Sequence, residues 1–251
     1  MSSEQQITLE NLDTCLKEVA KEYKKQTRGS VRAEIILVGG AAVLASYGFR
    51  EVTNDIDAII DAESVMRDVI NTVGDRLNLP NGWLNADFKN TSSFSWKIVQ
   101  HSEHYRTYSN VVEIRTVRAE YLVAMKIKAG RLYKKDMSDV VGILHEQQKS
   151  NHPLTFEMID RAVRELYNNW DGIDSYCIDL LKAALGASDI SLLFDSIVQQ
   201  ENDAKNSIVE IDKKYEELVN EDNVSDIILK ALEKKKSLTQ TPKEYSNYSI
   251  H

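Results

Sequence analysis

The stretch "ILVGGAAVLASYGFREVTNDIDAIID", from Ile36 to Asp61, decides the fold. It begins as a run of branched apolar residues that reaches two glycines, Gly39 and Gly40, which is typical of a buried strand ending in a turn. A helix-forming segment follows and stops near Gly48, and "NDIDAIID" then predicts a second strand. The order strand, glycine turn, helix, strand predicts an α/β fold.

Two aspartates, Asp55 and Asp57, alternate with isoleucine in the second strand. Because side chains alternate between the faces of a strand, both carboxylates point the same way, with α-carbons about 6.5 to 7 Å apart. Parallel carboxylates repel each other unless a cation lies between them, and Mg²⁺ takes carboxylate oxygens while keeping sites for water and phosphate. The alternative is an ordinary solvated strand face, but the apolar residues around the pair favour a cation site.

The glycine pair and the aspartate pair predict a single site. Glycines after a strand let a phosphate approach the backbone closely, and the start of the next helix supplies N–H groups and a positive dipole. A nucleoside triphosphate with its metal uses both features, because the phosphates need the turn and the metal needs the carboxylates. We therefore expect a metal-dependent triphosphate site between Gly39 and Asp57.

The rest of the chain divides into a mixed first half and a helical second half. We expect an α/β (α+β) protein in which a small mixed sheet flanked by helices is followed by an all-helical C-terminal region. The predicted domains are a core over 1–150, a helical domain over 151–236 and a flexible tail over 237–251. The predicted elements of the core, besides those above, are an amphipathic helix at 8–26, a helix at 63–77, two or three strands within 94–116 that include "SFSWKIV", a helix at 120–132 and another that begins at Asp136, the predicted N-cap.

Charge and composition limit the class of protein. The net charge is −8, with 20 acidic and 20 basic side chains in residues 1–150 but 19 and 11 in residues 151–251, which argues against a broad nucleic-acid surface in the second half. Cys15 and Cys177 are far apart, so neither a disulfide framework nor a zinc site is indicated. No uncharged apolar run reaches the roughly 18 residues that a membrane span needs. We expect a cytoplasmic protein with no membrane partner.

The three tryptophans are predicted to be core or domain-contact residues rather than platforms for base stacking. They are Trp83, Trp96 and Trp170.

These motifs resemble nucleotidyltransferases of the DNA polymerase beta superfamily. Within it they look closest to bacterial enzymes related to abortive-infection, type IV toxin-like nucleotidyltransferases. The resemblance is carried by "VGG", "GFREVTNDID" and "EYLVAMKIKAGRLYKKDMSDV", and it covers about residues 30–145. It implies a polymerase-beta-like core and Mg²⁺-dependent transfer of a nucleoside monophosphate from a triphosphate to a hydroxyl on a protein, a tRNA or a small molecule.

The resemblance also implies roles for individual residues. Asp55 and Asp57 would hold Mg²⁺, with Mn²⁺ as the alternative ion, and Asp136 and Asp139 would match a late acidic motif of the toxin-like enzymes. The nucleotide would bind to Gly39, Gly40, Arg50, Thr53, Lys126 and Arg131. The alternatives are a helix lysine extending from an apolar face for Lys126, first-turn helix acids for Asp136 and Asp139, and a surface loop residue for Arg50.

A third carboxylate on a later strand usually completes the two-metal site of such enzymes. Glu113 in "VVEIRT" is the first choice because it lies in a strand with apolar neighbours, and Asp87 is the second. With three carboxylates, two metal ions would activate the attacking oxygen and stabilise the pyrophosphate leaving group.

Several functions remain open at this point. One is the toxin of a toxin–antitoxin pair, with a cognate antitoxin as partner, and another is an antibiotic-type adenylyltransferase that acts on a small molecule. A third is a non-catalytic nucleotide-binding or interaction module that keeps the fold. Two features motivate the third function: Gly40, where many superfamily members carry serine, and the third carboxylate, which the sequence leaves open between Glu113 and Asp87.

Overall fold

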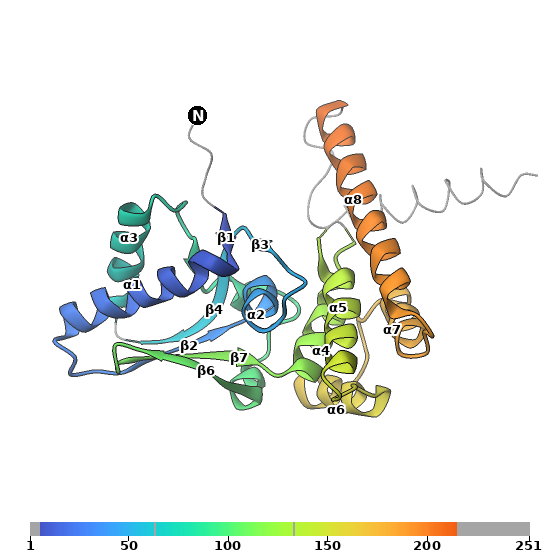
Figure 1. The fold of residues 1–251 in the computed structure, drawn as a ribbon, viewed down its shortest axis with the longest axis horizontal. Coiled ribbons are helices and arrows are strands. Elements are labelled where there is room, and N and C mark those ends of the chain that lie inside the picture. Colours follow the sequence, from blue (N-terminus) through green and yellow to red (C-terminus); the bar gives the residue numbers. More distant parts are fainter. Residues whose placement is uncertain (1–5, 63, 133, 215–251) are drawn as a thin grey trace, which may run out of the picture.

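The computed structural model describes residues 6–62, 64–132 and 134–214, which form two parts lying side by side (Figure 1). The first part is a mixed sheet with helices packed on it, and the second consists of helices. The predicted fold class is therefore confirmed. The sheet part contains β1 (Ile7–Thr8), α1 (Leu9–Thr27), β2 (Ala33–Leu37), α2 (Gly39–Ser46), β3 (Val52–Thr53), β4 (Ile56–Asp61), α3 (Met66–Leu77), β5 (Leu84–Asn85), the 3-10 helices η1 (Asp87–Asn90) and η2 (Trp96–His101), β6 (Ser102–Tyr108) and β7 (Val112–Val117). The helical part contains α4 (Ala119–Ala129), α5 (Asp136–Lys149), α6 (Phe156–Tyr167), α7 (Ser175–Leu185) and α8 (Ile190–Lys214).

Five strands form the main sheet in the order β5-β4-β2-β7-β6. β2 runs antiparallel to β4 and parallel to β7, and the register pairs Leu37 with both Ala58 and Thr116. The strand that leads to the glycine pair is therefore central, between the aspartate strand and a later strand. The end of β2, just before Gly39, therefore lies between residues of β4 and residues of β7.

One face of the sheet is apolar and is covered by α1. Ile35 and Ile114 lie on this face and are fully buried. Tyr108 pairs with Val112, so it lies on the same face, and its hydroxyl donates a hydrogen bond to Asp13 of α1. The amphipathic helix predicted at 8–26 is confirmed as α1, which packs against α3 above the sheet (Figure 1).

The segment at 93–99, predicted to be a strand from its alternating pattern, is instead irregular up to Ser95 and forms the start of η2 from Trp96 onward. Its polar groups bind α6 rather than a neighbouring strand. The carbonyl of Ser93 accepts a hydrogen bond from Tyr167, and the hydroxyl of Ser95 donates one to the carbonyl of Leu166. The alternation of serine and aromatic residues therefore reflects contacts with a helix, and the strand prediction for this segment is wrong.

The tryptophans differ in their surroundings. Trp83 is buried and donates a hydrogen bond to the carbonyl of Ile70, and Trp170 stacks on Phe156 with ring centroids 5.6 Å apart. Trp96 is 61% exposed, so it is not a core residue, and the alternative that it is a domain-contact residue stays a prediction.

The helical part is built around α4 and α5. α4 packs on α5 and α6, and α5 packs on α7 and α8, so helices from both sides of residue 150 share one core (Figure 1). The domain boundary at residue 150 stays a prediction, and the predicted tail at 237–251 lies outside the described residues. In the ranges that the structure describes, the helices are all too short or too polar to cross a membrane.

Phe49 joins the two parts just before Arg50. A Cβ atom placed on Gly142 of α5 would lie only 2.5 Å from the Phe49 ring. The ring also makes an edge-to-face contact with Phe194 of α8, with centroids 5.7 Å apart. The loop that carries Arg50 is thus held against α5 and α8, and Gly142 is the residue that leaves room for it.

We predict that Gly142→Ala destabilises the protein. Replacing glycine by alanine in a helix interior ordinarily stabilises by about 1 kcal/mol, but overpacking costs roughly 1–3 kcal/mol, and here the new methyl group meets the Phe49 ring. Thermal unfolding followed by circular dichroism should show a lower Tm. Gly48→Ala is the control, because no heavy atom of the described residues lies within 4 Å of a Cβ atom placed on Gly48. A Gly142→Ala protein as stable as the wild type would contradict this packing.

Candidate active site

The turn between β2 and α2 begins the candidate site. Gly39 is the first residue of α2 and has a φ of +56°, in the left-handed region that favours glycine. Val38 occupies the N-cap position, and its apolar side chain cannot accept hydrogen bonds from the first N–H groups of the helix. The start of α2 therefore keeps the donors and the positive dipole that suit an anion.

The aspartate pair lies directly beside this turn. The backbone N–H of Val38 donates to the carbonyl of Asp57 at 3.0 Å, and a Cβ atom on Gly39 would lie 3.3 Å from Oδ2 of Asp57. Asp55 is exposed just before β4, and Asp57 is half-buried. The glycine turn and the carboxylates, which are 15 to 18 residues apart in the chain, thus form one surface.

Burial and the charge of Asp55 raise the pKa of Asp57. Three cations oppose this shift by lowering the pKa, namely Arg131, Lys126 and Lys134, but they do not cancel it. The ionised form of Asp57 is therefore costly in the free protein, and a positive ion at the pair would relieve that cost.

Arg50 and Thr53 lie against the second glycine. A Cβ atom on Gly40 would be 2.6 Å from Nη2 of Arg50 and 2.8 Å from Oγ1 of Thr53. Both distances are shorter than real contacts, so no larger side chain fits unless Arg50 and Thr53 move. This is a physical reason for glycine where serine is common, because the guanidinium group fills the space that a serine side chain would take. The predicted role of Arg50 and Thr53 in phosphate binding stays a prediction.

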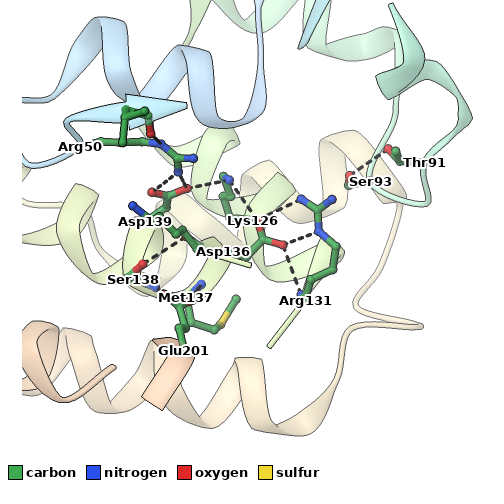
Figure 2. A network of polar contacts seen from close by, with 12 residues as sticks. Arg50, Thr91, Ser93, Lys126, Arg131, Asp136, Met137, Ser138, Asp139 and Glu201 are labelled. Atoms are coloured by element: carbon green, nitrogen blue, oxygen red, sulfur yellow. Dashed lines mark hydrogen bonds and ion pairs between the residues drawn. The ribbon is translucent and has the colours of Figure 1, made fainter. Parts of the chain in front are cut away.

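A chain of alternating charges runs from Arg50 into the helical part (Figure 2). Nη1 of Arg50 lies 2.7 and 2.5 Å from the two carboxylate oxygens of Asp139, which also accepts from Nζ of Lys126 at 2.7 Å. Lys126 donates to Asp136 at 3.0 Å, and Asp136 in turn accepts from Nε of Arg131 at 2.8 Å. The structure therefore brings five of the predicted site residues and motif acids together in one network.

The middle of this network is almost fully buried. Lys126 is 5% exposed, and Asp136 and Asp139 are each 1% exposed. Burial by itself would lower the pKa of Lys126, but Asp139 and Asp136 outweigh it and raise the pKa above its ordinary value. Burial likewise opposes ionisation of Asp136, yet Lys126 and Arg131 hold its pKa at about 2. These two aspartates are thus charge partners of cations, and both lie in the first turn of α5.

Asp136 is not the N-cap of α5, contrary to the prediction. Lys135 holds the N-cap position, and the carboxylate of Asp136 is directed at Arg131 and Lys126. Oε1 of Glu201, on α8, accepts the N–H groups of Met137 and Ser138 instead (Figure 2). Sequence reasoning missed Glu201, because one more glutamate in a polar helix gives no signal of burial.

The structure does not bring Glu113 to the aspartate pair. Glu34 of β2 pairs with Asp61 of β4 on one side and with Glu113 of β7 on the other, so Glu113 is level with Asp61. Asp61 lies four residues after Asp57 along β4, and β7 is two strands away from β4. At a strand rise of about 3.3 Å and a spacing of about 4.8 Å, the separation is roughly 13 Å along the strands and 10 Å across them. Glu113 instead faces His104 at 3.5 Å and lines a pocket of about 680 Å³ at the other end of the sheet.

Asp87 lies closer to the pair than Glu113 does. It begins η1 two residues after Asn85, which pairs with Asp57, and it is exposed. On the other side, the register places Val117 level with Asp57, with Val38 between them. Among the described residues, no group of three or more His, Cys, Asp or Glu side chains is arranged to hold a metal ion. The position on β7 that is level with Asp57 thus holds a buried apolar residue and no third carboxylate.

We predict that Asp57→Asn raises the Tm of the metal-free protein at pH 8. A carboxyl group whose pKa is raised on folding stabilises the fold below its unfolded pKa, and this contribution is lost as the pH rises through the raised folded value. The neutral amide removes the cost of ionisation, so the gain in Tm over the wild type should shrink toward pH 4. Asp61→Asn, an exposed acid on the same strand, is the control. An unchanged or lower Tm for Asp57→Asn at pH 8 would show that the cations outweigh burial and Asp55.

We also predict that Gly40→Ala destabilises the protein by about 1–3 kcal/mol, the usual cost of overpacking, because the methyl group displaces Arg50 from Asp139. A double-mutant cycle tests the cause. In an Arg50→Ala background the same glycine change should cost less, since only the Thr53 hydroxyl remains in the way. Equal costs in both backgrounds, measured by urea unfolding, would exclude Arg50 as the group that fills this space.

Comparison with known proteins agrees with the motifs. The family model described as "Nucleotidyltransferase of unknown function (DUF6036)" matches residues 14–171, a range that begins within α1 and includes the rest of the sheet part, α4, α5 and α6. No curated protein and no solved structure matches the chain. The predicted closeness to the toxin-like branch stays a prediction. The matched range covers more than half of the chain, and the chain therefore belongs to this family of nucleotidyltransferases.

Proposed function

We propose that the protein is a Mg²⁺-dependent nucleotidyltransferase that moves a nucleoside monophosphate from a triphosphate to a hydroxyl group. One observation carries the proposal: the glycine turn at the start of α2 and the carboxylates of Asp55 and Asp57 form a single surface, with Asp57 against Gly39. The family match to nucleotidyltransferases supports the same reaction class.

The start of α2 supports binding of the phosphates. The left-handed backbone of Gly39 and the absence of a Cβ atom let a phosphate oxygen approach the N–H groups of the first turn. Arg50 lies against Gly40 at the same turn, and its guanidinium carries a permanent charge. An anion at this turn therefore meets backbone donors and a helix dipole, and the guanidinium of Arg50, paired with Asp139, lies beside them.

The aspartate pair fits Mg²⁺. This ion is usually held by one or two carboxylates together with substrate phosphates and water, and two acids whose charges repel each other supply that donor set. Mn²⁺, which prefers similar oxygen ligands, is the alternative ion. When bound, the metal would polarise the phosphate oxygens and neutralise negative charge on them.

Positive charge beside the pair supports departure of pyrophosphate. Arg131, Lys126 and Lys134 all act on Asp57 through their charges, so the same field reaches phosphates bound there. The acceptor oxygen would form a bond to the α-phosphorus as the bond to the pyrophosphate oxygen breaks, and the hydroxyl proton would pass to water. The fixed cations would stabilise the charge that collects on pyrophosphate.

The acceptor class stays a prediction. The excess of acidic side chains in residues 151–251 favours a cationic small molecule over RNA, because like charges repel the phosphate backbone. A protein or tRNA acceptor, and the role of a toxin with a cognate antitoxin, follow from the resemblance alone.

The test is transfer of label from each of four α-labelled nucleoside triphosphates to components of a cell extract, with Mg²⁺ and then with Mn²⁺. The Asp55→Ala/Asp57→Ala double variant should lower transfer more than about a hundredfold, the usual loss when a group that stabilises transition-state charge is removed. Asp61→Asn controls for the loss of a strand carboxylate. Transfer by the double variant at the wild-type rate would show that Asp55 and Asp57 do not form the active site.

The second candidate is a nucleotide-binding module without catalysis. The sheet register favours it, because Val117 and not a carboxylate is level with Asp57 on β7. Calorimetry and a pyrophosphate assay distinguish the two functions. Triphosphate binding with pyrophosphate release supports the enzyme, and binding without release in the presence of extract supports the module.

A further inference from the structure

The N-terminus of α5 is capped by a side chain from another helix. Oε1 of Glu201, on α8, lies 3.0 Å from the backbone N of Met137 and 3.0 Å from that of Ser138, and both N–H groups donate to it (Figure 2). Glu201 is only 8% exposed, and both partner residues are buried. A residue more than sixty positions later in the chain therefore acts as the cap of this helix.

The residues at the start of α5 cannot supply this cap. Lys135, at the N-cap position, has a side chain that only donates hydrogen bonds. The carboxylate of Asp136 already accepts from Arg131 and Lys126. Without Glu201, two buried N–H groups would lose their acceptor, which is costly because buried donors need partners.

The first turn of α5, which Glu201 caps, contains both aspartates of the charge network. Asp136 and Asp139 both lie in the first turn of α5, and between them they bind Lys126, Arg131 and Arg50. Arg50 in turn lies against Gly40 at the start of α2. A shift of this turn would therefore move the cations beside the aspartate pair.

We propose that Glu201 is a positioning residue for the triphosphate site: it fixes the first turn of α5 and, through Asp136 and Asp139, the cations that face the phosphates. This inference rests on the proposed function for its consequence and on the described contacts for its geometry. α8 lies outside residues 14–171, so the cap belongs to the part of the chain that the family model does not match.

The surroundings of Glu201 make glutamine a sharp control. Burial raises its pKa to about 7, the bonds from Ser138 and Met137 act in the opposite direction, and the charge of Asp139 adds to the rise. Burial raises the pKa of Tyr176, on α7, and the charges of Cys177 and Glu201 add to that rise. Glutamine keeps an oxygen acceptor of the same length without the cost of ionisation. The proposal therefore requires an acceptor at this position and not a negative charge.

The experiment compares Glu201→Ala, Glu201→Gln and the exposed control Asp195→Asn, also on α8. Binding of non-hydrolysable analogues of the four nucleoside triphosphates with Mg²⁺ is measured by calorimetry. We expect Glu201→Ala to bind the preferred analogue about tenfold more weakly, a factor that corresponds to roughly 1.4 kcal/mol, because the cations beside the aspartate pair lose their fixed positions. Glu201→Gln and Asp195→Asn should bind as the wild type does. In the transfer assay kcat should fall as well as KM rise, because the same cations are proposed to stabilise the charge that collects on pyrophosphate.

Amide hydrogen exchange of the ligand-free proteins tests the geometry without any nucleotide. Protection at Met137 and Ser138, and at Arg131, whose N–H donates to Asp136 at 3.2 Å, should fall in Glu201→Ala and return in Glu201→Gln. If Glu201→Ala does not fold, Glu201→Asp, one methylene shorter, replaces it.

Two results would overturn the proposal. One is unchanged protection at Arg131 in Glu201→Ala, and the other is a glutamine variant as impaired as the alanine variant. If the wild type binds no triphosphate, the proposed function fails while the exchange data still decide whether Glu201 positions the turn.

Discussion

An alternating chain of buried charges joins the two parts of the molecule, and the candidate site depends on it. Arg50 comes from the sheet part, and Asp139, Lys126, Asp136 and Arg131 come from α4, α5 and the loop between them. Each carboxylate contacts two cations, and the lysine contacts two carboxylates. Breaking a buried ion pair by removing one partner costs roughly 3–5 kcal/mol, and the loss of any member here leaves at least one charge with fewer partners. The relation between the glycine turn and α5 is fixed as a result.

The need to bring Arg50 to this chain explains features that look like small departures from a motif. Gly40 leaves space for the guanidinium at the start of α2, and Gly142 leaves space on α5 for the ring of Phe49. Glycine in a helix lowers stability by about 0.5–1 kcal/mol relative to alanine. Its presence at both positions indicates that the close contacts with Arg50 and Phe49 outweigh this cost. Both glycines serve the same contact between the loop after α2 and the helical part.

The aspartates of the site have different neighbours, and these neighbours shift their pKa values in opposite directions. Asp136 is held by two cations with a pKa of about 2, so it stays ionised and bound to protein groups. Asp57, next to Asp55 and partly buried, has a raised pKa and gains most from an added positive ion. The same side chain thus serves as an internal counter-ion in α5 and as a candidate metal ligand in β4, and the difference arises from the neighbours that the fold provides.

The sequence by itself determined the order of elements around Gly39 and Asp57, because hydrophobic periodicity, glycine turns and helix signals act over a few residues. Periodicity also predicted α1 correctly, yet it mistook the alternation at 93–99 for a strand, since only α6 reveals what those serines bind. Tertiary structure alone decided that Glu113 lies at the far end of the strands and that Glu201 caps α5. Register and helix packing set both positions, and they depend on contacts between residues distant in the chain, which no local pattern encodes.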